Sequence, residues 1–131
     1  MERTRIILDT NFLMIPGQFK VDIFHELDKI ASFPHEICIF KETIDELNKI
    51  AEKNTKDKIN AKIALMFIKQ KNLKILKNSL KKQDFYIDDI ILGNVREGDY
   101  VCTQDQDLKR LLKKQNIKII ALKSRKYLGY A

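Results

Sequence analysis

Short apolar runs alternate with longer amphipathic segments along the whole chain. The runs at residues 4–9, 37–40, 73–76, 100–103 and 117–121 are too short for helices, which predicts buried strands. Between them, apolar positions recur every three or four residues, which predicts helices at residues 18–32, 43–53, 55–68, 88–97 and 105–115. Strands that alternate with helices imply an α/β fold of three layers, with helices on both faces of a mostly parallel central sheet.

Several local features refine this outline. Pro16-Gly17 punctuates the chain and should close the first segment. Thr55 can cap the third helix. The predicted buried stripe of that helix comprises Ile59, Ile63, Met66 and Phe67 or Ile68. Residues 77–86 are polar and basic and predict a loop, and residues 123–131 predict a short basic C-terminal tail.

Length and composition fit one soluble domain. The chain has 131 residues, of which 44% are hydrophobic and 33% are charged. A chain of this length can bury roughly two-thirds of its unfolded surface without crosslinks. No apolar run approaches the roughly 18 residues that span a bilayer, and the N-terminus lacks the apolar core of a signal peptide. We therefore expect a single domain over residues 1–131, no membrane partner and a cytoplasmic location.

The cysteines and histidines do not predict a metal site. Cys38 and Cys102 lie in predicted strands, without CxxC or Cys/His spacing. Buried reduced thiols are the simplest interpretation. His25 and His35 likewise belong to no metal-ligand spacing, so we expect them to be surface or packing residues.

Positive charge is concentrated in the second part of the chain. The net charge is +7, and residues 51–131 carry nineteen Lys or Arg against nine Asp or Glu. Residues 109–131 contain no acidic residue. A solvated lysine-rich surface is the simplest interpretation, and contact with nucleic-acid phosphates is the functional alternative. The candidate contacts are Lys109, Arg110 and Lys113, with Tyr127 or Tyr130 available for base stacking.

Polar and acidic residues recur where predicted strands end. In parallel α/β sheets, sites form at the carboxyl ends of the strands, and Asp9, Thr103 and Asp105 all fall at that edge. Each has an ordinary alternative role. Asp9 could simply begin a turn, Asp105 could be only an N-cap, and Thr103 could be a strand-end hydroxyl. Asn11, two residues after Asp9, could be a turn residue.

Helix phase selects among the remaining acids. With 3.6 residues per turn, Asp88 shares an apolar stripe with Ile91, whereas Asp89 points about 100° away. Glu46 lies on the shoulder of the apolar face of its helix, whereas Asp45 points outward. A carboxylate beside an apolar face is costly unless it is paired, hydrogen-bonded or bound to a cation. A helix cap for Asp88 and a solvated position for Glu46 are the simpler alternatives.

These carboxylates suit hard cations. Several carboxylates that face one strand edge repel one another and raise each other's pKa unless cations compensate them. Oxygen ligands of this kind favour Mg²⁺ or Mn²⁺. Two such ions about 4 Å apart can activate water and stabilise the leaving oxygen in phosphodiester cleavage. We therefore predict two divalent ions at this edge of the sheet.

Four segments carry a resemblance to a known family. The segments I-L-D-T-N-F-L (7–13), I-D-E-L (44–47), I-D-D-I-I-L (87–92) and V-C-T-Q-D-Q-D-L (101–108) together resemble the PIN-domain nucleases over nearly the whole chain. The chain is similar to the archaeal and eukaryotic subgroup that processes ribosomal RNA. The resemblance implies that the catalytic and metal-binding set is Asp9, Glu46, Asp88 and Asp105, with Asp107 as a candidate fifth ligand. It also implies supporting roles for Asn11 and Thr103, which would orient ligands or water.

The resemblance further implies an activity and its partners. It predicts a metal-dependent endoribonuclease that hydrolyses phosphodiester bonds in RNA processing, on single-stranded or loop regions. One alternative is a toxin-type ribonuclease similar to VapC, which would need an antitoxin partner. Another is an inactive PIN-like module that binds RNA or protein. A homodimer and a processing complex are further partners that the resemblance suggests.

Overall fold

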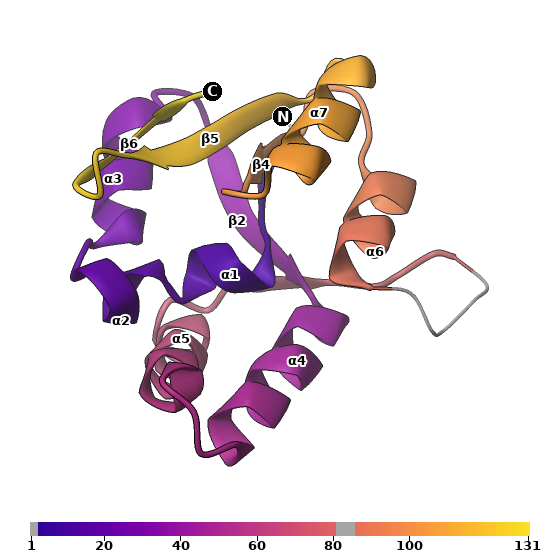
Figure 1. The fold of residues 1–131 in the computed structure, drawn as a ribbon. Helices are drawn as coiled ribbons and strands as arrows, with labels where there is room; N and C mark the ends of the chain where they lie inside the picture. The colour runs from indigo at the N-terminus through magenta and orange to yellow at the C-terminus, as the bar shows by residue number, and fades with distance from the viewer. Residues whose placement is uncertain (1–2, 81–85) are drawn as a thin grey trace.

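The predicted apolar runs become strands of one central sheet in the computed structural model, which describes residues 3–80 and 86–131 (Figure 1). Within these residues the strands are β1 (Thr4–Leu8), β2 (His35–Phe40), β3 (Lys74–Leu76), β4 (Tyr100–Cys102), β5 (Lys118–Lys123) and β6 (Tyr127–Tyr130). The helices are α1 (Thr10–Leu13), α2 (Ile15–Phe19), α3 (Ile23–Ile30), α4 (Lys41–Glu52), α5 (Asp57–Gln70), α6 (Ile87–Asn94) and α7 (Gln106–Lys114).

The strand order places a topological switch point in the middle of the sheet. The order is β3-β2-β1-β4-β5-β6, and the first five strands of this order run parallel, whereas β6 pairs antiparallel with β5. The chain therefore proceeds from β1 toward one edge and then returns to build the other side from β4. In such sheets the crevice at the carboxyl ends of the two strands that flank the switch point is the usual ligand site. Here these strands are β1 and β4.

Side chains of β1 alternate between two cores, which explains why its last three residues, Ile6, Ile7 and Leu8, are all apolar. Ile6 and Leu8 belong to one buried cluster, together with residues of α1 to α5. Ile7 belongs to the other cluster, with residues of α6 and α7 such as Ile90 and Leu108. Helices therefore cover both faces of the sheet, and the predicted three-layer α/β fold is confirmed. Cys38 and Cys102 are buried thiols, as expected.

The first predicted helix is wrong in its boundaries. Residues 10–30 form three helices, and Pro16-Gly17 lies inside α2 instead of ending a segment. Proline is tolerated in the first turn of a helix, because the amide hydrogen that it lacks would have no helical acceptor there. Gly17 allows α2 to approach α5 closely, since a Cβ atom at this position would lie 2.5 Å from Oδ1 of Asn60.

The predicted buried stripe of α5 is right only in part, because Ile68 is buried as predicted and Ile63 and Phe67 are half-buried. Ile59 is 67% exposed and Met66 is 47% exposed, whereas Ala61, Ala64 and Ile68 are buried. The helix turns its small residues inward because it packs closely against α4 and α2. Large side chains fit poorly into such a close contact and lie at its margin. The residue that precedes the helix is Lys56, without a side-chain cap, so Thr55 does not act as the predicted N-cap.

The predicted C-terminal tail is largely a strand. Residues 127–130 form β6, which pairs along β5 and contributes Leu128 to the core. The tyrosines on either side of it, Tyr127 and Tyr130, are each 51% exposed. The predicted loop at residues 77–86 lies partly outside the described residues, because the description omits residues 81–85.

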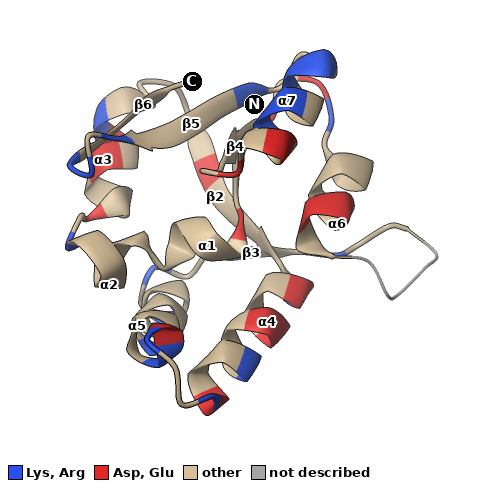
Figure 2. Ribbon diagram, viewed as in Figure 1, with Lys and Arg blue, Asp and Glu red and all other residues tan. Residues whose placement is uncertain are grey.

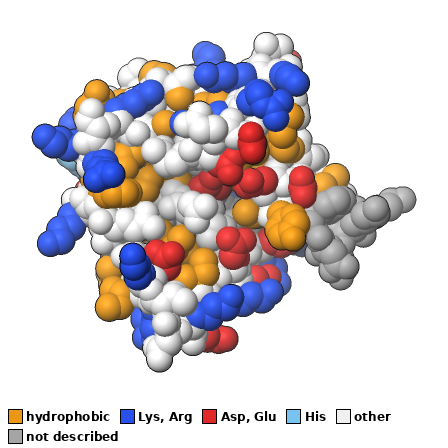
Figure 3. Space-filling view, in the orientation of Figure 1, with side chains coloured by type: hydrophobic (Ala, Val, Ile, Leu, Met, Phe, Trp, Pro, Cys, Tyr) orange, Lys and Arg blue, Asp and Glu red, His pale blue; other side chains and the backbone are white. Residues whose placement is uncertain are grey.

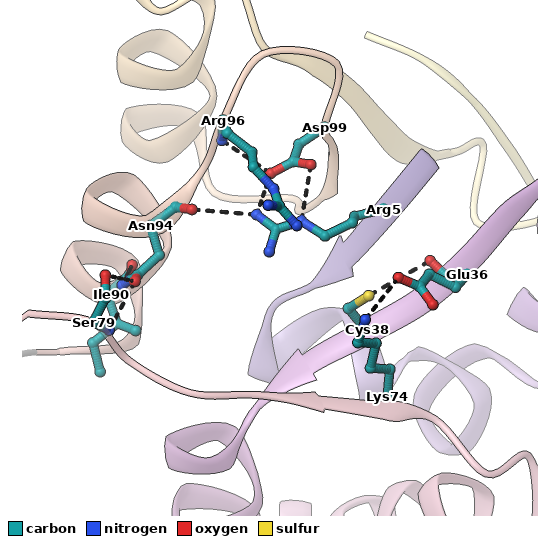
Figure 4. Close-up of polar contacts among 9 residues, drawn as sticks. All are labelled: Arg5, Glu36, Cys38, Lys74, Ser79, Ile90, Asn94, Arg96 and Asp99. Atoms are coloured by element: carbon teal, nitrogen blue, oxygen red, sulfur yellow. Dashed lines mark hydrogen bonds and ion pairs between the residues drawn. The ribbon is translucent and has the colours of Figure 1, made fainter. Parts of the chain in front are cut away.

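A buried ion pair fixes the amino-terminal edge of the sheet (Figure 4). The Arg5 guanidinium donates to both carboxylate oxygens of Asp99, at 3.0 and 2.6 Å, and to the carbonyl oxygen of Asn94 at 3.2 Å. The backbone amide of Arg96 donates to the same carboxylate at 3.0 Å. Hydrogen bonding to Asp99 raises the pKa of Arg5. The pair therefore ties the end of α6 to β1, at the edge opposite the predicted site.

The Asn94 side chain extends this network. Its Oδ1 accepts hydrogen bonds from the amide and hydroxyl of Ser79, at 2.9 and 2.6 Å, and its Nδ2 donates to Asn78 and to the carbonyl oxygen of Ile90. Helix α6 is thus joined by hydrogen bonds both to the sheet and to the segment after β3.

Among the residues that the structure describes, no helix is long and apolar enough to cross a membrane.

Candidate active site

Asp9 lies at the centre of the sheet's carboxyl edge, directly after β1. Its backbone amide donates to the carbonyl oxygen of Cys102 at 3.2 Å, which joins the ends of β1 and β4 at the switch point. Its side chain is the N-cap of α1, because Oδ1 accepts a hydrogen bond from the amide of Phe12 at 2.7 Å. The residue is only 3% exposed. Asp9 therefore begins a turn, as the sequence allowed, and its carboxylate is buried as well.

Thr103 joins Asp9 to Asp105. The buried Thr103 hydroxyl donates to Oδ2 of Asp9 and accepts a hydrogen bond from the backbone amide of Asp105 at 3.1 Å. Asp105 is the N-cap of α7, since its Oδ1 accepts from the amide of Leu108 at 2.8 Å. The hydroxyl thus sets the orientation of one carboxylate and the backbone position of the other.

The electrostatic environment of Asp9 disfavours its ionised form. Burial raises the pKa of Asp9 to about 6, and the negative charges of Asp88 and Asp105 add to this effect. Hydrogen bonds from Thr103 and from the amide of Phe12 oppose it, but only in part. A carboxyl group with this balance gains from any cation placed against it.

Glu46 and Asp88 share this environment. Burial raises the pKa of Glu46, as does the negative charge of Asp88, while a side-chain contact with Thr10 lowers it. Burial also raises the pKa of Asp88, with further contributions from Asp105 and Asp89. Figure 2 shows acidic positions in α4 and α6, at the end of β1 and at the start of α7, around the carboxyl edge of the sheet.

Helix phase correctly predicted which acid of each neighbouring pair turns inward. Asp88 and Glu46 are half-buried, whereas Asp89 and Asp45 are exposed. Asp45 lies 3.4 Å from the ammonium of Lys41, one turn earlier on the outer face of α4.

The donor set fits a hard divalent cation. Among the ion pairs found for the described residues, none involves Asp9, Glu46, Asp88 or Asp105. The negative charges of neighbouring acids help to raise the pKa of Asp9, Glu46 and Asp88, which is a condition that ion binding relieves. In residues 3–80 and 86–131, however, no three His, Cys, Asp or Glu side chains lie close enough together to form a ready metal site. Ion binding would require these side chains to move closer.

The other predicted residues lie at the margin of this cluster. Asn11 is exposed on α1. Asp107 is exposed in the first turn of α7, and its charge is not among those that perturb Asp9. The predicted cations Lys109, Arg110 and Lys113 lie along α7, and Figure 3 shows basic side chains above the acidic ones on this face.

Two residues at this edge were missed by the sequence interpretation, and a third, Lys123, belongs to the basic run that the sequence offered for phosphate contact. Thr10 is buried and contacts both Glu46 and the hydroxyl of Thr43, which lies 3.4 Å away. Oε1 of Glu42, in the first turn of α4, is buried without a hydrogen-bond partner in the part of the chain that the structure describes. Lys123 ends β5 close enough to lower the pKa of Lys109. The position of each residue immediately beside a strand end was the available signal.

Replacing Thr103 with Val tests the hydroxyl that joins the two aspartates. Valine keeps the shape of threonine but cannot donate to Asp9 or accept from the amide of Asp105. We expect the rate of RNA cleavage, the activity that the sequence predicts, to fall by about 10- to 100-fold, which is the usual effect of removing a group that orients ligands. The pKa of Asp9 should rise above 6, since the hydrogen bond from Thr103 lowers it. A pH–rate profile measures both changes. Thr103→Ser, which keeps the hydroxyl, should retain most activity, and equal losses in the two variants would contradict this role.

The fold and the site together define a class of α/β protein, with a mostly parallel sheet and acidic residues at its topological switch point. The chain belongs to the PIN-like domain family, because a family model described as "PIN like domain" matches residues 6–125. The match confirms the predicted resemblance.

Individual relatives agree with this assignment. Ribonuclease VapC4 of Methanocaldococcus jannaschii is 30% identical over 128 residues, which cover 94% of this chain and 93% of the relative. The structure of the PIN domain endonuclease Utp24 has a TM-score of 0.79 and 26% identity, covering 96% of this chain and 90% of that one. VapBC2 from Rickettsia felis, bound to a DNA fragment from the promoter, has a TM-score of 0.60 at 17% identity, covering 90% and 98%, and supports the fold alone.

Proposed function

We propose that this protein is a metal-dependent endoribonuclease that hydrolyses internal phosphodiester bonds of RNA. The observation that carries the proposal is the buried Asp9, whose carboxylate is held by Thr103 and faces the charges of Asp88 and Asp105. The family supports a nuclease, and the names of two relatives, a ribonuclease and a PIN domain endonuclease, support RNA cleavage.

Each acidic residue would have a defined part. Asp9, Glu46, Asp88 and Asp105 would hold Mg²⁺ or Mn²⁺, with Asp107, exposed in the first turn of α7, as an outer candidate. When bound, such ions lower the pKa of water and neutralise charge on the phosphodiester oxygens. Thr103 would keep the Asp9 carboxylate in one orientation, and Asn11, exposed on α1, would contact water or substrate beside it. The ammonium groups of Lys109 and Lys113 and the guanidinium of Arg110 would attract the RNA backbone.

The biological role is proposed as RNA processing, in the cytoplasm, by a single domain over residues 1–131. The resemblance of the four acidic segments to the subgroup that processes ribosomal RNA favours this role, and the match to the PIN domain endonuclease Utp24 at a TM-score of 0.79 supports an endonuclease. A toxin-type role is the second candidate, because Ribonuclease VapC4 is 30% identical over 94% of this chain. That role would require an antitoxin partner, and either role permits a homodimer. An inactive binding module is disfavoured, since all four predicted acids are present and three show raised pKa values.

One assay tests the activity itself. Labelled single-stranded RNA and DNA of the same sequence are incubated with the protein in Mn²⁺, in Mg²⁺ and in EDTA. We expect internal cleavage of RNA with either ion, little cleavage of DNA, and none in EDTA. Cleavage that persists in EDTA would contradict the metal-dependent mechanism. RNA that is bound but never cut would support the inactive module instead.

A further inference from the structure

The turn between β5 and β6 extends from the carboxyl edge of the sheet, where the acidic residues lie. The amide of Lys126 donates to the carbonyl oxygen of Lys123 at 3.0 Å, which closes a tight turn around Ser124 and Arg125. Both central residues have positive φ, 52° and 56°. Glycine or asparagine usually occupies such positions, because a left-handed backbone strains other residues. The turn therefore holds a long cationic side chain where a small residue would be less strained.

Arg125 lies over an exposed aromatic ring. The centre of its guanidinium is 5.8 Å from the centroid of Phe19, the last residue of α2, which is 40% exposed. The two side chains come from opposite ends of the chain. Figure 1 shows α1 leading from the end of β1 toward α2, on the side of the molecule where the β5–β6 turn lies. We call Phe19 and Arg125 together the stacking pair.

Strand β5, which leads into the turn with Arg125, is joined by hydrogen bonds to the loop of the candidate active site. The Gln104 side chain accepts a hydrogen bond from the amide of Leu122 at 2.6 Å and donates to its carbonyl oxygen at 3.2 Å. Gln104 lies between Thr103 and Asp105, so the loop that carries the acidic residues is joined to the end of β5. The stacking pair therefore has a fixed connection to the carboxylates.

Positive charge continues from the candidate active site toward the stacking pair. Burial lowers the pKa of Lys109, and the positive charges of Lys123, at the end of β5, and of Lys113 lower it further. Figure 3 shows basic side chains over α7 and around the β5–β6 turn, above the acidic cluster. Residues 109–131 contain no acidic residue that would repel a phosphate backbone.

We propose that Phe19 and Arg125 form a stacking platform for an unpaired base of the RNA substrate, at the far end of a basic path from the acidic cluster. The proposal rests on the proposed ribonuclease function and adds where the strand runs. An exposed aromatic ring and a planar guanidinium each stack on bases, and neighbouring lysines bind the intervening phosphates. The basic run of residues 109–131, which contains no acid and leads from the acidic cluster proposed to cleave RNA, favours single-stranded RNA over an acidic protein segment.

Two substitutions of Phe19 separate stacking from simple covering of the surface. Phe19→Leu keeps an apolar side chain but removes the ring, whereas Phe19→Tyr keeps the ring. Binding of a labelled single-stranded RNA is measured in EDTA, where it is not cleaved. We expect Phe19→Leu to weaken binding about tenfold and Phe19→Tyr to retain it. Tyr130→Leu is the comparison: the sequence also offered Tyr130 for base stacking, but it lies beside Tyr100 at the opposite edge of the sheet, so this variant should bind RNA like wild type.

An RNA of the same length that lacks its bases tests whether Phe19 stacks on a base or only supports the structure of the binding surface. On this abasic strand the loss caused by Phe19→Leu should disappear, because only the base can stack. Arg125→Gly relieves the left-handed strain at this position, so it should leave the melting temperature unchanged or higher while RNA affinity falls. A loss of affinity that follows a loss of stability would overturn the proposal.

The outcomes also separate this proposal from the function on which it rests. If the wild-type protein binds and cleaves RNA but Phe19→Leu behaves like wild type, the stacking platform is wrong and the ribonuclease remains. If Phe19→Leu weakens intact and abasic RNA equally, the surface does not read bases, and the platform is again wrong. If the wild-type protein neither binds nor cleaves single-stranded RNA, both proposals fail.

Discussion

Replacing Asp9 with Asn should abolish RNA cleavage while making the metal-free protein more stable at neutral pH. Asn keeps the size of the side chain and can accept the hydrogen bond from the amide of Phe12, which retains the cap of α1. It removes the carboxylate at the switch point, whose pKa the negative charges of Asp88 and Asp105 help to raise. We expect the cleavage rate in Mn²⁺ to fall by roughly a thousandfold or more, because a central ionic ligand is lost.

The expected gain in stability follows from the pKa of Asp9. Its ordinary value is 3.8, and in the folded protein it is raised to about 6, so the folded state binds this proton more tightly than the unfolded state. The stabilisation from protonated Asp9 is complete below pH 3.8 and is lost as the pH rises through 6. The loss amounts to about 3 kcal/mol for a shift of roughly two units. Asn cannot ionise and should avoid most of it.

Denaturant unfolding in EDTA at several pH values measures this effect. Wild type should lose stability between pH 4 and pH 7, whereas Asp9→Asn should show a smaller slope, with Glu46 and Asp88 contributing what remains. Mn²⁺ should raise the free energy of unfolding of wild type but hardly that of the variant. An Asp9→Asn protein that is less stable than wild type at pH 7 in EDTA would show that the carboxylate is stabilised without a cation.

Features of the fold that depend on local pattern were predictable from the sequence. In the strand predicted at residues 4–9, the run Ile6-Ile7-Leu8 is apolar because its two faces contact two different cores, which is the pattern of a central parallel strand. The phase of Asp88 and Glu46 was predictable because both lie on regular helices with clear apolar faces. Capping by Asp105 followed from its place directly before a helix.

Features that depend on the packing partner were not predictable in the same way. Helix α5 has two rival stripes, and the contact with α4 and α2 selects the one with alanines. Strand β6 is short and carries polar and aromatic residues, so its pattern resembles an extended tail until β5 provides a pairing edge. Thr103 was predicted to support the site, but its link between Asp9 and Asp105 depends on β4 pairing beside β1. Strand order is a long-range property that a local pattern does not contain.

Two pairs of adjacent acids provide internal controls for the inward-facing carboxylates. Asp88→Asn and Glu46→Gln should each lower the cleavage rate by about a hundredfold or more, whereas Asp89→Asn and Asp45→Asn should stay within about twofold of wild type. Each control removes the same charge from a neighbouring position of the same helix. Asp45 pairs only with the exposed Lys41, and such surface pairs contribute little.

The Asp89 control should also leave a specific signature in the pH–rate profile. The negative charge of Asp89 helps to raise the pKa of Asp88, so removing it should shift the acidic limb of the profile slightly toward lower pH without changing the plateau rate. Loss of general helix stability would lower the plateau instead. If Asp89→Asn reduces cleavage as much as Asp88→Asn, then net charge at the start of α6 matters more than direction, and the assignment of Asp88 fails. Asp88 and Asp89 differ by one residue, which is about 100° of rotation around the helix, so this pair tests directly whether the direction of the carboxylate matters.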